Sequence, residues 1–126
     1  MPKTKLVFYR EDGVAPALEW LNELRAKNER AFAKCRARLQ RLAELGHELR
    51  RPEADYLRDD IYELRSRLGT VNYRLLHFFH GRGLTIVSHG CTKEDQVPNA
   101  EINLAIARRN TFIADPAKHT QERDIL

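Results

Sequence analysis

The sequence has few of the features that mark secreted, membrane or metal-binding proteins. Its two cysteines, Cys35 and Cys91, lie far apart and form no spaced set like those of zinc ribbons or disulfide scaffolds. No apolar run approaches the roughly 20 residues that a membrane-spanning helix needs. The N-terminal stretch MPKTKLVFYRED also has no long apolar segment like that of a secretory signal. We therefore expect a soluble, cytoplasmic protein without membrane contact.

Internal repeats, low-complexity tracts and domain-scale linkers are also missing from the sequence. A chain of 126 residues fits one compact domain with a single core. We expect this domain to span residues 1–113. The remaining stretch, 114–126 (ADPAKHTQERDIL), is polar apart from its end and is expected to be a flexible tail.

The charge of the chain is unevenly distributed. Lysine and arginine total 22 against 18 acidic residues, a net charge of +4, and residues 25–51 alone hold nine bases against three acids. A basic stripe on a helix is typical of proteins that bind a polyanion. The same stripe also fits a solvated helix face or a docking surface for an acidic protein.

Apolar periodicity predicts the order of the elements. Spacings of three and four predict a helix at about 15–27, a second from about 28 to Gly46, and a third from 98 to about 113. A β-prone run at 6–10 and three strands between 61 and 93 complete the pattern, while 47–60 reads as irregular because Pro52 interrupts it. We predict an α+β fold with a small, mainly antiparallel sheet, an N-terminal two-helix hairpin on one face, and a C-terminal helix.

The stretch IYELRSRLGTVNYRLLHFF, residues 61–79, predicts a β-hairpin with a two-residue type II′ turn at Gly69-Thr70. Pairing Leu68 with Val71 places the apolar residues of both strands on a core face, which holds Tyr62, Leu64, Leu68, Val71, Tyr73 and Leu75. Arg65 and Arg74 then lie opposite each other on the second face, where like charges repel unless a carboxylate or another anion is near. Glu63 is the available internal partner.

The next turn decides which residues of the following strand join this second face. A two-residue loop at Gly81-Arg82 would pair Arg74 with His89 and Asn72 with Cys91, whereas a three-residue loop would reverse the faces. The first register gathers an outward-facing basic patch of Arg65, Arg67, Arg74, His89 and Lys93. Leu76, Phe78 and Val87 share that face, and we expect the final helix to cover them and leave the basic end open.

Such a patch suits a ribonuclease that needs no metal. Arginine offers a planar fork of donors to a phosphate, and histidine titrates near neutrality, so it can move protons. An anion-binding or interface patch without chemistry explains the same residues. His89 and Cys91 would also suit zinc, but two ligands do not make a site, so no metal or cofactor is expected. We interpret His77 as a half-buried packing residue.

The run from Leu57 to Arg109 resembles the phage-derived, HigB-like toxins of the RelE/ParE superfamily, which belong to bacterial type II toxin–antitoxin systems. The resemblance is carried by the ordered spacing of Tyr62-Glu-Leu-Arg65, of Tyr73-Arg74, of His89-Gly-Cys-Thr-Lys93, and of Pro98 before an alanine-rich basic helix. It implies a RelE-like sheet with two helices on one face and ribosome-dependent cleavage of messenger RNA. It also implies neutralisation by a cognate antitoxin, often a helix-turn-helix protein.

The resemblance also assigns roles to matching positions. Arg65 and Arg74 would bind the phosphate and its transition-state charge, Lys93 would stabilise charge or assist the leaving group, and His89 would transfer a proton. From the basic stripe and the basic patch, and not from the resemblance, RNA-binding positions are expected at Arg36, Arg38, Arg41 and Arg67. Glu94 and Asp95 follow Lys93 where relatives often carry another basic residue. Two alternatives stay open: a ParE-like toxin that inhibits gyrase, and a basic binding module without catalysis.

Overall fold

The computed structural model describes residues 4–92 and 96–123, and it has the α+β fold that the sequence predicts. Its elements are β1 (Lys5–Tyr9), α1 (Pro16–Lys27), α2 (Glu29–Leu45), a 3₁₀ turn η1 (Gly46–Glu48), β2 (Ala54–Arg58), β3 (Ile61–Leu68), β4 (Val71–His80), β5 (Leu84–Thr92), α3 (Asn99–Ala114) and β6 (Thr120–Gln121). The six strands form one sheet in the order β2-β3-β4-β5-β1-β6. Every pairing is antiparallel except that of β1 with β5.

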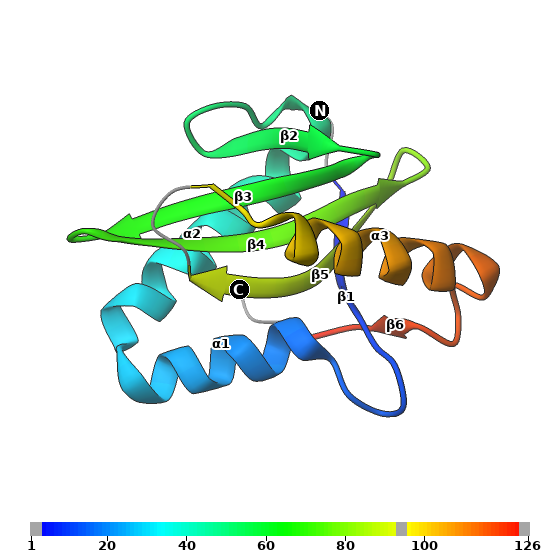
Figure 1. Cartoon of the computed structure of the whole chain (residues 1–126), viewed down its shortest axis with the longest axis horizontal. Helices are drawn as coiled ribbons and strands as arrows, with labels where there is room; N and C mark the ends of the chain where they lie inside the picture. The colour runs from blue at the N-terminus through cyan, green and yellow to red at the C-terminus, as the bar shows by residue number, and fades with distance from the viewer. Residues whose placement is uncertain (1–3, 93–95, 124–126) are drawn as a thin grey trace.

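Helices cover both faces of this sheet (Figure 1). On one face, α1 and α2 bury a cluster that includes Phe32, Leu39, Leu64 and Leu75. On the other, α3 covers a second cluster around Phe78, and residues from both β3 and β4 contribute to it. Within the described ranges, no helix is long and apolar enough to cross a membrane. The two faces are called here the hairpin face and the α3 face.

Asn28 forms the corner of the predicted helical hairpin. Its backbone N–H donates to the carbonyl of Leu24 at 2.7 Å and closes α1. Its side-chain Oδ1 accepts from the N–H of Ala31 at 3.1 Å and caps α2. Pro16 occupies the first turn of α1, where the missing N–H leaves no helical bond unmade. Both predicted helices are therefore confirmed, with bounds close to those expected.

The β3–β4 hairpin has the predicted register. Leu68 pairs with Val71, and Arg65 lies directly opposite Arg74. Gly69 has a φ of +62°, and Thr70 is not among the residues with positive φ, which is the pattern of a type II′ turn. The turn thus sets the side-chain parity of both strands, and the arginines face away from the helical hairpin.

The β4–β5 connection differs from the predicted register. The loop has three residues, 81–83, between the paired ends His80 and Leu84. The side chains in the first half of β5 therefore point to the faces opposite to those predicted, and Val87 packs on the hairpin face. A β-bulge then leaves Ser88 unpaired and restores the parity, because His77 pairs with Val87 and Leu76 with His89.

The bulge changes the predicted partners of the basic strand. The expected pairs of Arg74 with His89 and of Asn72 with Cys91 are wrong, because Arg74 lies opposite Cys91 and His89 lies opposite Leu76. His89 nevertheless stays on the α3 face, as expected, because the bulge lies before it.

Two strands were not predicted. β2 lies within 47–60, the region that Pro52 made look irregular, and it pairs with β3 at the edge of the sheet. β6 lies in the stretch expected to be a flexible tail, where it pairs with β1. His119 is buried there, its ring stacked 5.6 Å from that of Tyr9. The described part of 114–126 is therefore packed on the sheet rather than separate from it.

Gly90 on β5 lies directly against Trp20 of α1. A Cβ at this position would overlap the indole ring of Trp20, which packs edge-on against Tyr73. Gly90→Ala is therefore expected to lower the free energy of unfolding by about 1–3 kcal/mol in urea titrations. Gly83→Ala is the matched control, since nothing lies within 4 Å of a Cβ there. Equal stability of the two variants would contradict this packing.

Candidate functional site

Two arginines and a glutamate meet on the α3 face of β3 and β4, and this group is called here the arginine–glutamate cluster (Arg65, Arg74 and Glu63). Arg74 Nη1 donates to Glu63 Oε1 at 3.2 Å, and Arg65 Nε lies 3.8 Å from Glu63 Oε2. The side chains of Arg74 and Glu63 are only 6% and 7% exposed, whereas that of Arg65 is 34% exposed. The predicted role of Glu63 as the partner of the facing arginines is confirmed.

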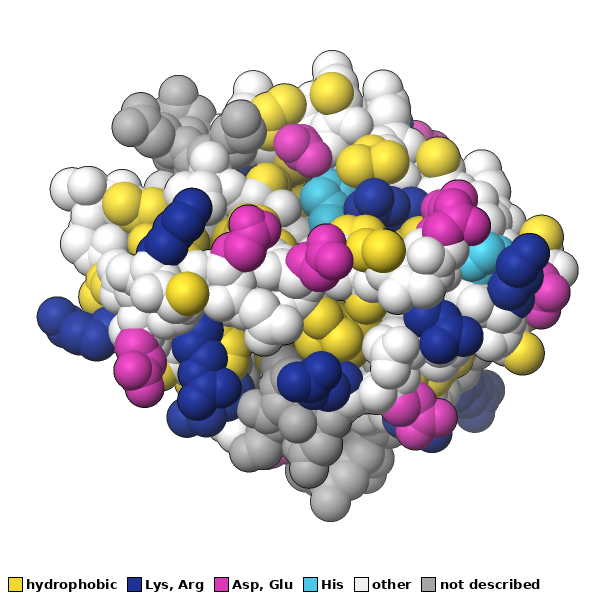
Figure 2. Space-filling model, turned by 90° about the horizontal axis from the view of Figure 1, so that it is seen from below, with side chains coloured by type: hydrophobic (Ala, Val, Ile, Leu, Met, Phe, Trp, Pro, Cys, Tyr) yellow, Lys and Arg dark blue, Asp and Glu magenta, His cyan; other side chains and the backbone are white. Residues whose placement is uncertain are grey.

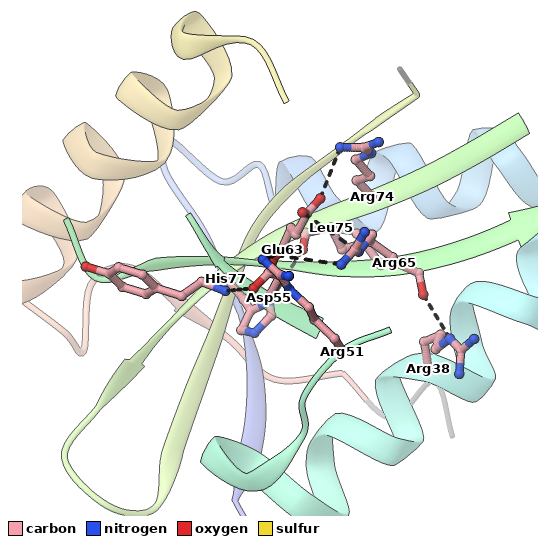
Figure 3. Close-up of polar contacts among 9 residues, drawn as sticks. Arg38, Arg51, Asp55, Glu63, Arg65, Arg74, Leu75 and His77 are labelled. Carbon is pink, nitrogen blue, oxygen red and sulfur yellow. Dashed lines mark hydrogen bonds and ion pairs between the residues drawn. The ribbon is translucent and has the colours of Figure 1, made fainter. Parts of the chain in front are cut away.

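An aspartate on the edge strand extends this cluster. Asp55 on β2 pairs with Glu63 on β3 in the ladder, and its Oδ2 lies 3.7 Å from Arg65 Nη2 and 2.9 Å from Arg51 Nη2. The hydrogen bond from Arg51 is the main cause that holds the pKa of Asp55 below its usual range. Basic and acidic groups therefore alternate across three neighbouring strands, from Arg51 to Arg74 (Figure 3).

The cluster is less open than the sequence predicts. Arg74 and His89, both expected to look outward, are only 5% and 6% exposed. His89 lies between β5 and α3, with Nδ1 2.8 Å from Ser88 Oγ and Nε2 3.0 Å from Glu101 Oε1. Burial, reinforced by the charge of Arg108, lowers the pKa of His89 despite the nearby Glu101. His89 therefore favours the neutral form at neutral pH, while Arg65 is the member that solvent reaches.

His77 lies on the opposite face and is fully buried rather than half-buried. Its ring stacks on Tyr62 at 5.8 Å and meets Phe79 edge-on at 5.6 Å. Burial lowers the pKa of His77 to about 4, because the charged form cannot be hydrated there. The imidazole is thus a neutral packing group of the core.

Three of the four predicted RNA-binding arginines line one cavity of about 500 Å³ between α2 and β3, called here the α2–β3 groove. Its charged lining residues are Lys34, Arg38, Arg41, Glu53 and Arg67. Glu53 accepts from Arg38 Nη1 at 2.7 Å and from Arg41 Nη2 at 2.9 Å, and the bond from Arg41 is the main cause that lowers its pKa. One carboxylate thus holds two basic side chains, and Arg67 keeps an exposed guanidinium at the mouth.

The remaining predicted residues lie apart from this groove or outside the described ranges. The guanidinium carbon of Arg36 lies 5.9 Å from the ring centre of Phe32 on α2, where a cation–π contact forms. Lys93, with Glu94 and Asp95, is outside the described residues. Among those described, no group of three or more histidine, cysteine or acidic side chains is placed to hold a metal ion.

The positive charge of the chain is not spread over the whole surface. On the face seen in Figure 2, basic and acidic side chains are interspersed, without an extended field of one sign. Basic side chains outnumber acidic ones around the α2–β3 groove, whereas the two signs alternate along β2 and β3. Charge steering of a polyanion would therefore favour the groove.

A comparison with models of protein families identifies the family of the chain. Residues 19–110 match the family model described as Phage derived protein Gp49-like (DUF891), which covers most of the chain from α1 into α3. The chain belongs to the Gp49-like family. This family is part of the RelE/HigB-like toxin superfamily and is associated with the toxins of toxin–antitoxin systems. Membership implies an antitoxin as a partner. A comparison with curated proteins found no match.

The Gp49-like match includes β2, whose polar residues the sequence did not single out. Glu53, directly before β2, accepts from Arg38 and Arg41, and Asp55 on β2 pairs with Arg65, yet both carboxylates lie in the stretch read as irregular. Because β2 is short and Pro52 precedes it, no pattern in the sequence distinguished these two carboxylates.

Proposed function

We propose that this Gp49-like protein is the toxin of a type II toxin–antitoxin system that cleaves messenger RNA on the ribosome without a metal ion and so inhibits translation. The observation that carries the proposal is the pair of facing arginines, Arg65 and Arg74, held on adjacent strands by the buried carboxylate of Glu63. Like charges at directly opposite positions oppose sheet formation, so an anion-binding role is a physical reason to keep both.

The cluster suits the charge changes of RNA cleavage. Attack by a 2′-oxygen on the phosphate builds negative charge on the phosphoryl oxygens, and guanidinium groups fixed beside them stabilise it. Arg65 is placed to meet the phosphate first because it is partly exposed, and its ion pairs to Asp55 and Glu63 are long, at 3.7 and 3.8 Å. A phosphate that approaches Arg65 therefore displaces weak contacts rather than short hydrogen bonds.

Other roles follow the resemblance to the superfamily. The buried Arg74 would add positive charge next to Arg65 and so stabilise the phosphate, and Lys93 would assist the leaving group. His89 stays a proposed proton-transfer group, and substrate would reach it only where the contact with Glu101 opens. The α2–β3 groove, with Arg38, Arg41 and Arg67, would contact RNA outside the reacting nucleotide.

The proposed partners are an antitoxin, which the resemblance suggests is a helix-turn-helix protein, and messenger RNA in the ribosome of the cytoplasm. Two other functions use the same surface: inhibition of gyrase by a ParE-like toxin, and anion binding without catalysis. One observation favours anion binding without catalysis: the buried Arg74 already forms an ion pair with Glu63. These alternatives predict different results in cells.

Mapping the 5′ ends of transcripts after brief induction in a bacterial host tests the proposed reaction. We expect new ends inside translated frames within minutes, and their loss when translation initiation is blocked. Intact messenger RNA together with a DNA-damage response would contradict the ribonuclease and support a gyrase toxin. Intact messenger RNA and unchanged growth would instead support a binding module.

A further inference from the structure

A small pocket at the edge of the sheet is not explained by the cluster or the groove. It has a volume of about 320 Å³ and lies where the chain enters β2. Its lining comprises Arg50 and Arg51, the acidic Asp55, the tyrosines Tyr56 and Tyr62, and the buried Leu49 and Ala54. We call it the β2 edge pocket. Ligand pockets generally range from roughly 300 to 1,000 Å³, so this one has room for a ligand of about one nucleoside.

The aromatic side of the pocket is both exposed and held in place. Tyr56 is 50% exposed, so solvent reaches its ring. Its ring meets Tyr62 edge-on at 5.1 Å, and Tyr62 in turn meets Phe79 edge-on at 5.0 Å. The Tyr56 hydroxyl accepts a hydrogen bond from the backbone N–H of Asp60 at 3.2 Å. An oriented aromatic ring binds a flat partner with little further loss of side-chain entropy.

The basic side of the pocket connects directly to the arginine–glutamate cluster. Arg51 is 76% exposed and pairs with Asp55 Oδ2 at 2.9 Å, and the same oxygen faces Arg65 at 3.7 Å. Figure 3 shows Arg51, Asp55 and Arg65 grouped around Glu63. Because one carboxylate oxygen contacts both guanidinium groups, a chain of phosphates can reach both arginines in succession.

We propose that the β2 edge pocket binds an unpaired nucleotide of RNA next to the phosphate held by Arg65. The base stacks on the Tyr56 ring, and Arg51 leaves Asp55 to meet the adjoining phosphate. Stacking on aromatic rings beside basic groups is how proteins hold single-stranded nucleic acid without choosing its sequence. The pocket thus supplies affinity for single strands rather than a base preference. This inference rests on the proposed function, because Arg65 is taken as the phosphate site.

Binding of a short RNA that cannot be cleaved tests the pocket apart from catalysis. The probe is a fluorescent hexamer of mixed sequence with 2′-O-methyl riboses, titrated at low salt with the full chain. Tyr56→Leu is expected to weaken binding at least about fivefold, since one base stack contributes that much or more. Tyr56→Phe keeps the ring and is expected to bind like the wild type. Leu104→Ala removes an exposed apolar side chain from α3 and is the control for unspecific effects.

Salt dependence gives a second measurement on the basic side. Loss of one phosphate contact in Arg51→Gln should reduce the slope of log affinity against log salt by roughly 0.7 for a single strand. A hexamer annealed to its complement should bind without dependence on Tyr56, because its bases are already stacked. Tyr56-dependent binding of the duplex would contradict a base-stacking pocket.

The outcomes separate this pocket from the proposed active site. Binding by Tyr56→Leu within twofold of the wild type overturns the pocket, and so does an equal loss in Tyr56→Phe. If Arg65→Gln binds the RNA normally while Tyr56→Leu does not, the result supports the nucleotide pocket and contradicts the phosphate site at Arg65. If Tyr56→Leu binds RNA normally but loses the cognate antitoxin, the pocket is a protein interface and the RNA assignment is wrong.

Discussion

Arg65→Gln is expected to reduce the rate of messenger RNA cleavage in a translating extract by about 10²- to 10³-fold. The reason is electrostatic: Arg65 is the partly exposed member of the cluster, and removal of one preorganised donor from a developing oxyanion typically has an effect of this size. The fold should change little, because the contacts of Arg65 with Asp55 and Glu63 are long, at 3.7 and 3.8 Å, and Arg74 stays beside the buried Glu63 carboxylate. Cleavage is measured by primer extension on one defined transcript.

Two further variants make this result specific. Arg65→Lys keeps the charge but loses the planar fork, so its rate should fall between those of the wild type and Arg65→Gln. Arg82→Gln removes an exposed arginine from the β4–β5 turn and should cleave at the wild-type rate. If Arg65→Gln and Arg82→Gln both kept full activity, Arg65 would not be a catalytic residue.

Arg74→Met is expected to lower the free energy of unfolding by about 3–5 kcal/mol. The change removes the closer of the two arginines paired with the buried Glu63 carboxylate and leaves Arg65 at 3.8 Å, and an undercompensated buried charge is strongly destabilising. Because folding itself is affected, loss of toxicity in this variant would not identify Arg74 as a catalytic residue. Urea unfolding followed by circular dichroism measures the change.

The double variant Glu63→Met/Arg74→Met separates the ion pair from simple loss of packing. Two apolar side chains of similar size remove both buried charges, so we expect most of the lost stability to return. Arg82→Met, at an exposed position, should unfold like the wild type. A double variant as unstable as Arg74→Met alone would show that the pairing with Glu63 is not what stabilises Arg74.

The β3–β4 hairpin shows how far local sequence can define a structure. Gly69 accepts the positive φ of a type II′ turn, and that turn determines which residue of β4 faces which residue of β3. The alternating apolar residues then assign the core face. For this reason the opposition of Arg65 and Arg74, and the partnership with Glu63, follow from the residues of the hairpin alone.

The β4–β5 pairing shows where the same reasoning fails. Loop length alone would have moved His89 to the hairpin face, and the bulge at Ser88 moves it back. A bulge adds one residue to one strand, and no local residue pattern distinguished it from a regular strand here. With the bulge in place, Val87 packs against the helical hairpin and His89 contacts α3. The two halves of β5 therefore each place their side chains against a helix.

By itself, the sequence determined the helical hairpin, the parity of the central strands and the facing arginines, because periodicity, a helix cap and a tight turn act within a few residues. Only the tertiary structure decided that β2 forms the sheet edge, that Asp55 lies beside Arg65, and that Arg74 and His89 are buried. Those features depend on contacts between segments far apart in the chain. An edge strand of five residues obtains its order from its partner strand, and a side chain becomes buried only when another element covers it.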